Sequence, residues 1–213
     1  MYRLARPGDP DYPTQLLGYP VDPPQRLYVV GKPIPGDAAI IGVAGSRDPT
    51  KYGMRLARRL GMELARRGYV VATGFASGID AGAVRGAVGV GGHVVGVLPY
   101  LYEDAGATTL IKNPLLQELL GYKNLTLISE NLTRDPDRVR EWLALRNRVI
   151  DGLSSAVVIV ETRYRQWGWG TAYHIRFGLE VGKPVYILMP TWTSDWSVWE
   201  GYREFTRRGA TPV

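Results

Sequence analysis

Short polar turns follow several apolar runs of this sequence, and their residue types suit phosphate binding. Gly45, Ser46 and Arg47 come directly after the apolar run 38–44. Glycine and hydroxyl residues let a backbone approach an anion closely, and arginine adds charge and paired donors. A helix-like segment follows, and the N–H groups of a helix N-terminus also attract anions. These residues predict an anion pocket.

Later turns add residues of the same kinds. The turn 73–80 supplies hydroxyl and glycine residues, and the loop 161–171 follows the apolar run 156–160. Glycine turns follow strands in many folds, so the prediction depends on their combination at one edge. Asp80 either contacts a ligand or caps the helix that begins beside it. The candidates from these turns are Thr73, Gly74, Ser77, Gly78, Gly170 and Thr171.

The loop 163–172 places arginine beside aromatic residues. Arg163, Tyr164, Trp167 and Trp169 lie within seven positions of one another. Exposed aromatic rings beside cations suit stacking on unpaired bases while the cations hold the backbone. Packing of Trp169 beneath the loop is the competing interpretation.

A basic segment, LRNRVID, adds Arg146, Asn147 and Arg148 to the candidates. The two arginines either reach phosphate or form a solvated helix face. Asn147 between them is the less expected polar residue.

Alternating strand and helix segments must position these turns. Apolar runs predict strands at 38–44, 69–72, 93–98, 125–128, 156–160 and 184–189. Amphipathic or small-residue segments predict helices at 52–67, 79–90, 114–120, 139–153 and 171–181. Such alternation predicts an α/β fold, Rossmann-like and doubly wound, with a mostly parallel sheet. Ligands of such sheets bind at the carboxyl ends of the strands.

The two ends of the chain differ from this pattern. Residues 1–37 are rich in proline and predict an N-terminal arm of turns, with one short strand at 27–30, packed on a Rossmann-like domain at 38–213. Near the C-terminus, Trp192, Trp196 and Trp199 share one face if they are helical. We expect core or dimer packing of these rings rather than ligand stacking.

Composition narrows the function. The 213 residues contain no cysteine and only two histidines, so disulfides, thiolate chemistry and a zinc site are not expected. The net charge of +6 favours nucleic acid or phosphorylated ligands, although an ion-paired thermophile surface gives a similar balance. No signal peptide or membrane-length apolar run is present, and we expect a cytoplasmic protein without a membrane partner.

Several enzyme motifs are missing from the sequence. It contains no G-x-x-x-x-G-K-[ST] loop, no strand-linked G-x-G-x-x-G with a ribose-binding acid, and no visible Ser-His-acid set. We therefore expect a non-enzymatic protein without a cofactor or metal.

The longer motifs resemble a known family, the DNA-processing protein A (DprA/Smf) family. The similarity is to its Rossmann-like core, covers nearly the whole chain, and is carried by GVAGSRDPTKYG, TGFASGIDAGAVRGA, RNRVIDGLSSAVVIVE and GYREFTRRGA. Two positions depart from the family pattern: Val84 replaces a histidine, and residues 166–169 replace a Ser-Gly-Ser-Leu loop.

The resemblance implies a homodimer that binds single-stranded DNA and helps to load a RecA-type recombinase during natural transformation. It also implies a binding pocket at matching positions. These are Gly45, Ser46, Arg47, Ser77, Gly78, Arg146, Asn147, Arg148 and Thr171.

A related family gives the alternative. Phosphoribohydrolases that cleave nucleoside monophosphates share the Rossmann-like core, and TGFASGIDAGAVRGA is similar to their sequences too. Their catalytic loop places a glutamate two or three residues after Gly-Thr, whereas Gly170 and Thr171 are followed by Ala172, Tyr173 and His174. The alternative is thus a binder of a nucleotide-derived small molecule, or an enzyme of this type.

Overall fold

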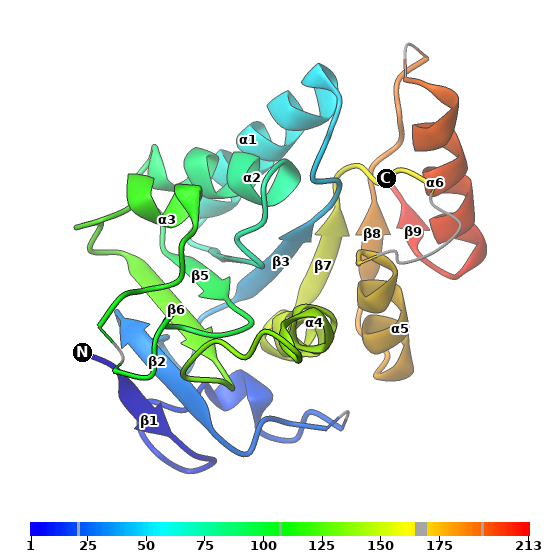
Figure 1. Ribbon diagram of the computed structural model, residues 1–213. Helices are drawn as coiled ribbons and strands as arrows, with labels where there is room; N and C mark the ends of the chain where they lie inside the picture. Colours follow the sequence, from blue (N-terminus) through cyan, green and yellow to red (C-terminus); the bar gives the residue numbers. More distant parts are fainter. Residues whose placement is uncertain (21, 107, 165–169, 193) are drawn as a thin grey trace.

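The centre of the molecule is a sheet of short, apolar, mostly parallel strands (Figure 1). The structure, a computed structural model, describes residues 1–20, 22–106, 108–164, 170–192 and 194–213. Over these residues the strand order is β1-β2-β6-β5-β4-β3-β7-β8-β9. The parallel strands are β3 (Ile40–Ala44), β4 (Val70–Thr73), β5 (Val94–Val97), β6 (Leu125–Ser129), β7 (Ala156–Ile159), β8 (Val185–Ile187) and β9 (Thr211–Pro212). The predicted α/β fold with a mostly parallel sheet is confirmed.

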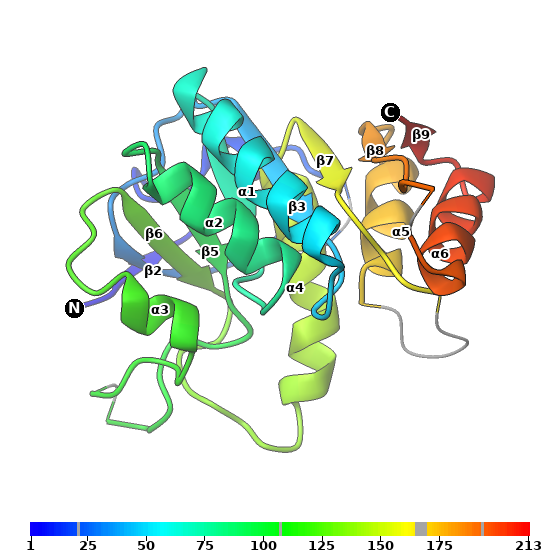
Figure 2. The ribbon, with the colours of Figure 1, turned by 90° about the horizontal axis from the view of Figure 1, so that it is seen from above.

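Helices cover both faces of the sheet (Figures 1 and 2). Side chains of β4 alternate between two cores: Val71 faces one cluster, and Val70 and Ala72 face the other. The first cluster lies under α1 (Lys51–Arg66), α2 (Ile79–Val88) and α3 (Pro114–Glu118). The second lies under α4 (Val139–Leu153) and the 3₁₀ turn η1 (Thr14–Leu16). Next to these, α5 (Ala172–Glu180) contacts α4, and α6 (Trp196–Arg207) contacts β8.

The N-terminal segment extends the same sheet. The strand expected at 27–30 is present as β2 (Leu27–Gly31), which pairs antiparallel with β6. A further strand, β1 (Arg3–Ala5), pairs antiparallel with β2 and is missing from the sequence-based expectation. Three residues are too few to show the alternation of apolar and polar side chains that predicts a strand. Tyr12 is buried and donates its hydroxyl hydrogen to the Pro24 carbonyl at 2.8 Å, which fixes the proline-rich turns to the core.

The C-terminal tryptophans do not share a core face. Trp192 precedes α6 and is 91% exposed, and Trp196, the first residue of the helix, is 68% exposed. The core face of α6 is formed instead by Val198 and Phe205, and Trp199 is half-buried. The expected core packing is therefore wrong for Trp192, which precedes the helix, and for Trp196, which lies off the face that Val198 and Phe205 bury.

Neither a membrane-spanning helix nor a metal-binding cluster is found among the residues that the structure describes. None of their helices is both long and apolar enough to cross a membrane. Among the same residues, no group of three or more histidine, aspartate or glutamate side chains is arranged to hold a metal ion.

Candidate functional site

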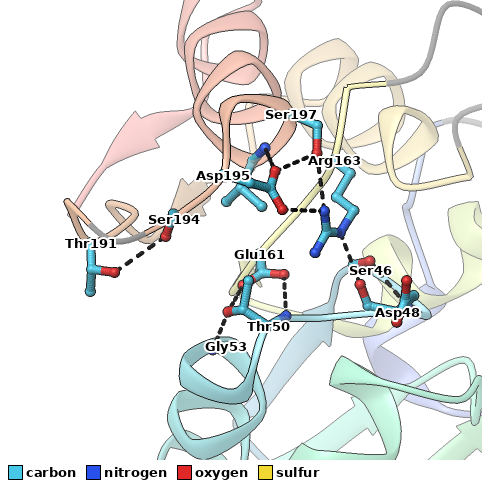
Figure 3. Close-up of polar contacts among 11 residues, drawn as sticks. Ser46, Asp48, Thr50, Gly53, Glu161, Arg163, Thr191, Ser194, Asp195 and Ser197 are labelled. Atoms are coloured by element: carbon cyan, nitrogen blue, oxygen red, sulfur yellow. Dashed lines mark hydrogen bonds and ion pairs between the residues drawn. The ribbon is translucent and has the colours of Figure 1, made fainter.

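The strand order reverses between β3 and β7, and the predicted site residues surround this reversal. The chain crosses from β3 to β4, β5 and β6 on one side, whereas β7 and β8 lie on the other side of β3. Connections that leave neighbouring strands in opposite directions open a crevice outside their carboxyl ends. The segments that leave β3 and β7 lie side by side at this edge (Figure 3).

The turn after β3 and the start of α2 bind each other through the backbone. The Ser46 N–H donates to the Glu161 carbonyl at 2.7 Å, and the Ser46 carbonyl accepts from the Ile79 N–H at 3.0 Å. Gly78 has φ +77°, and a Cβ there would lie 2.2 Å from the Ser46 oxygen. A Cβ on Gly45 would lie 2.6 Å from the Glu161 oxygen. Both predicted glycines are therefore needed for this close approach.

Asp80 organises the turn between β4 and α2. Its buried carboxylate accepts from the backbone N–H groups of Gly74 at 3.0 Å and Ala76 at 3.2 Å. Burial raises the pKa of Asp80, and the positive charge of Arg146 partly offsets that rise. Thr73 also acts locally, because its hydroxyl accepts from the N–H two residues later. Asp80 thus binds the turn that precedes α2 instead of capping the helix.

Arg146 places a buried cation beside this turn. Its Nη1 donates to the Val97 carbonyl at 2.9 Å, and its Nε is buried without a hydrogen-bond partner in the described part of the chain. Burial lowers its pKa to about 10, against the opposing effect of Asp80, so the side chain stays charged at neutral pH. A Cβ on Gly74 would lie 1.5 Å from Nη1, so only glycine leaves room for the guanidinium.

Asn147 and Thr171 fix the start of α5. The Asn147 side-chain amide donates to the Gly170 carbonyl at 3.0 Å. The hydroxyls of Thr171 and the buried Thr162 share a hydrogen bond of 3.0 Å. These contacts tie the start of α5 to α4 and to the segment that follows β7.

These segments enclose a cleft of about 470 Å³, here called the carboxyl-edge cleft. Three arginines and, among described residues, no acidic side chain are present in its lining, which consists of Gly45, Ser46, Arg47, Arg140, Leu143, Ala144, Thr162, Arg163, Gly170, Thr171 and Tyr173. A second hollow of about 210 Å³ shares Arg47 and Leu143 with the cleft and adds Gly74, Ser77 and Arg146. The two hollows form one cationic edge.

The N-terminus of α1 is already occupied by a carboxylate. Glu161 accepts from the Thr50 N–H at 2.8 Å and from the Thr50 hydroxyl at 2.5 Å (Figure 3). Gly53 in the first turn leaves room for it, since a Cβ there would lie 2.4 Å from Glu161 Oε2. The expectation that this helix end receives a bound anion is therefore wrong, because the chain supplies its own.

Arg163 is held by groups of the chain. Its Nη1 contacts Asp195 Oδ2 at 2.5 Å and Ser197 Oγ at 3.1 Å, and its Nε donates to the Asp48 carbonyl at 3.0 Å (Figure 3). The side chain lines the cleft but joins the turn after β3 to the start of α6. Its charge is largely balanced by Asp195.

Arg148 is not part of the cleft. Its side chain is 7% exposed and forms a two-pronged ion pair with Glu130, at 2.5 and 2.8 Å, while its Nε donates to Asp22 at 3.2 Å. These contacts join α4 to the turn after β6 and to the N-terminal segment. The prediction that Arg148 reaches phosphate is therefore wrong, and so is the alternative of a solvated face.

The cleft also contains residues that the sequence-based prediction missed. Arg140, Leu143 and Ala144 precede Asn147 by seven, four and three positions, which places all four on one face of α4. That spacing was sufficient to find Arg140 once Asn147 was chosen. Tyr173 follows Thr171 on α5 and stacks with Phe177, with ring centroids 5.8 Å apart.

The structure brings most predicted site residues to this edge. The cleft and the adjoining hollow contain Gly45, Ser46, Arg47, Gly74, Ser77, Arg146, Arg163, Gly170 and Thr171. The contacts of Thr73, Gly78 and Asn147 given above stabilise the turns that line these hollows. Trp167 and Trp169 lie outside the described residues, and Tyr164 is 39% exposed next to them.

Sequence comparison places the chain among known proteins. Residues 3–213 match the family model of DNA recombination-mediator protein A. Protein Smf of Synechocystis sp. is 33% identical over 196 residues, 87% of this chain and 46% of the relative. DNA processing protein DprA of Bacillus subtilis is 31% identical over 169 residues, 78% of this chain and 54% of the relative. The chain therefore spans about half the length of these relatives.

Structural comparison agrees with the fold. A structure of DNA processing protein A from Helicobacter pylori, described for its single-stranded DNA binding mode, matches with a TM-score of 0.77 and 24% identity. The match covers 100% of this chain and 90% of that one. The Bacillus subtilis and Helicobacter pylori proteins are named for DNA processing and not for a catalysed reaction. The expected resemblance is confirmed, and the chain belongs to the DNA recombination-mediator protein A family.

Proposed function

We propose that this chain binds single-stranded DNA in the carboxyl-edge cleft, without catalysis, as a protein of the DNA-processing A type acting in DNA uptake or recombination. The observation that carries the proposal is the charge of the cleft: within the described residues its lining has no acidic side chain, and Arg47 and Arg140 have no acidic partner. A relative described as binding single-stranded DNA has the same fold.

In this proposal the residues of the edge have different roles. Arg47 and Arg140 are exposed at the rim and have no acidic partner among described residues, so they are available to phosphates. Ser46 and Thr171 supply hydroxyls beside them. The ring of Tyr173 offers a face for an unpaired base. Binding of this kind is steeply salt-dependent and indifferent to sequence.

Titration of labelled oligo-dT against single variants tests the proposal. Arg47→Gln and Arg140→Gln should each weaken binding about tenfold at low salt, since one charge-assisted contact contributes about 1.5 kcal/mol. Lys123→Gln, which removes an exposed charge away from the cleft, is the matched control and should change little. Unchanged affinity in both arginine variants would reject the cleft.

A nucleotide-derived small molecule is the second candidate, because the cleft volume of about 470 Å³ lies within the range of small-ligand pockets, about 300–1,000 Å³. The phosphoribohydrolase form of this proposal lacks an acid in the described lining, and Glu161 is engaged by Thr50. Incubation with nucleoside monophosphates, followed by analysis for free base, decides the matter: release at catalytic rates would replace DNA binding as our first choice.

We further propose a cytoplasmic homodimer with a RecA-type recombinase as partner, and residues 1–37 as an arm on the domain 38–213. Family membership supports the partner, and the exposed Trp192 and Trp196 supply apolar surface for a second copy. Light scattering should give twice the monomer mass, and Trp196→Ser should lower it toward the monomer. Co-purification with a RecA-type protein tests the partner separately.

A further inference from the structure

A second basic hollow lies between α1 and α2, away from the carboxyl-edge cleft. Its volume is about 370 Å³. We call it the α1–α2 groove, and its lining consists of Arg55, Arg58, Arg59, Met62, Arg85, Gly86, Gly89 and Val90. Figure 2 shows α1 and α2 side by side over the sheet, with α6 at the other end of the molecule. The groove is therefore a surface that the proposed function does not use.

Glycines give the groove its shape. A Cβ on Gly86 would lie 2.0 Å from the Arg58 carbonyl, and a Cβ on Gly61 would lie 2.0 Å from the Ala83 carbonyl. The two helix backbones are thus in contact, which interdigitating larger side chains would prevent. Because Gly86 and Gly89 carry no side chain, the α2 wall stays bare, and Met62 and Val90 supply the apolar part of the lining, here called its floor.

Three of the four groove arginines lack an acidic partner within the described residues, whereas Arg85 pairs with Glu118 at 2.6 Å. Arg55, Arg58 and Arg59 are exposed and have no acidic partner among the residues that the structure describes. On α6, by contrast, Arg203 pairs with Glu200, and both Arg207 and Arg208 pair with Glu204. The three α6 arginines are therefore balanced by carboxylates, whereas Arg55, Arg58 and Arg59 present a positive field.

The basic stripe continues to the carboxyl edge. Lys51 is exposed four residues before Arg55, about 6 Å along the helix axis, and Arg47 precedes it on the rim of the cleft. A chain of regularly spaced negative charges can follow Arg47, Lys51 and Arg55 into the groove. An unpaired base has the flat apolar face that the floor of Met62 and Val90 can receive.

We propose that the α1–α2 groove is a second binding surface for single-stranded polynucleotide, in which arginines hold phosphates and the floor receives a base. The choice of occupant rests on the proposed function. A single strand that leaves the carboxyl-edge cleft along α1 reaches the groove, so a long oligonucleotide contacts both surfaces.

The test compares two triple variants of equal net charge. Arg55→Gln/Arg58→Gln/Arg59→Gln removes the groove cations, and Arg203→Gln/Arg207→Gln/Arg208→Gln removes three charges from α6. Titration with long oligo-dT at several salt concentrations gives the affinity and its salt slope. Losing three phosphate contacts should lower the slope by about 2 and the low-salt affinity at least about tenfold, because each contact on a single strand contributes about 0.7 to the slope. The α6 variant should behave like wild type.

Each outcome separates the groove from the cleft. If the two triple variants bind oligo-dT equally, the groove proposal is rejected. Weaker binding by Arg47→Gln then still supports the cleft. Weaker binding by the groove variant, with no loss in Arg47→Gln or Arg140→Gln, supports the groove and rejects the cleft. No oligo-dT binding by the wild type rejects both. If labelled poly-glutamate binds the wild type but not the groove variant, while oligo-dT binds both equally, an acidic polypeptide replaces polynucleotide as the occupant.

Discussion

Replacing Arg148 by methionine should destabilise the fold and leave DNA binding unchanged. Methionine keeps an apolar stem of similar length but removes the guanidinium, which is bonded to Glu130 at 2.5 and 2.8 Å and to Asp22 at 3.2 Å. Burial alone lowers the pKa of Arg148, but the hydrogen bonds and charges of Glu130 and Asp22 together outweigh this effect and raise it. The pair with Glu130 is thus favourable in the folded state.

The expected cost follows from the exposure of the partners. Breaking a fully buried pair costs about 3–5 kcal/mol, because the remaining charge stays uncompensated. Glu130 is 27% exposed and regains some water, whereas Asp22 is 78% exposed and contributes little. We therefore expect a loss of about 2–3 kcal/mol in the free energy of unfolding.

Urea unfolding of Arg148→Met, Glu130→Gln and the double variant measures this loss and the coupling between the two residues. A coupling of about 1–2 kcal/mol is expected, because the two side chains contact each other directly. Oligo-dT affinity, measured where all variants are folded, should match wild type. A stability within about 0.5 kcal/mol of wild type, combined with weaker DNA binding, would refute the reasoning and return Arg148 to the binding site.

Other predictions follow from single contacts. Gly74→Ala should displace the Arg146 guanidinium, cost about 1–3 kcal/mol and weaken oligo-dT binding as much as Arg146→Met does, which urea unfolding and titration check. Burial and the charge of a nearby lysine lower the pKa of His93 to about 4, so the unfolded chain binds a proton more readily than the folded chain. The free energy of unfolding should therefore fall by about 1–2 kcal/mol between pH 6.5 and about 4, after allowance for partial exposure, and His93→Gln should remove that fall. Trp192→Ser should change the free energy of unfolding of the monomer by less than about 0.5 kcal/mol, because the ring is solvated.

Local patterns predict the elements of this fold but not their order. The expected helix at 139–153 has the bounds of α4, and the expected strand at 38–44 begins two residues later as β3. The apolar runs of β5 and β7 are nearly interchangeable in composition, so nothing local shows that β7 lies beside β3 and β5 does not. That choice depends on packing across the whole sheet.

Local sequence likewise predicts only part of the candidate site. The residue types in the turns predict a cationic edge, and the spacing on α4 is enough to indicate Arg140. Which arginines remain available depends on partners far away in the sequence. Glu130 and Asp22 neutralise Arg148 from 18 and 126 positions away, and Asp195 holds Arg163 from 32 positions away. No local pattern carries that information.

The most direct test of the central claim is to map where single-stranded DNA touches the protein. Oligo-dT carrying a photoreactive base, cross-linked to the wild-type protein and analysed by mass spectrometry, should label peptides that contain Arg47, Arg140 or Tyr173 around the carboxyl-edge cleft. Cross-links confined to the opposite end of the strands, near Lys32 and His93, would contradict the account.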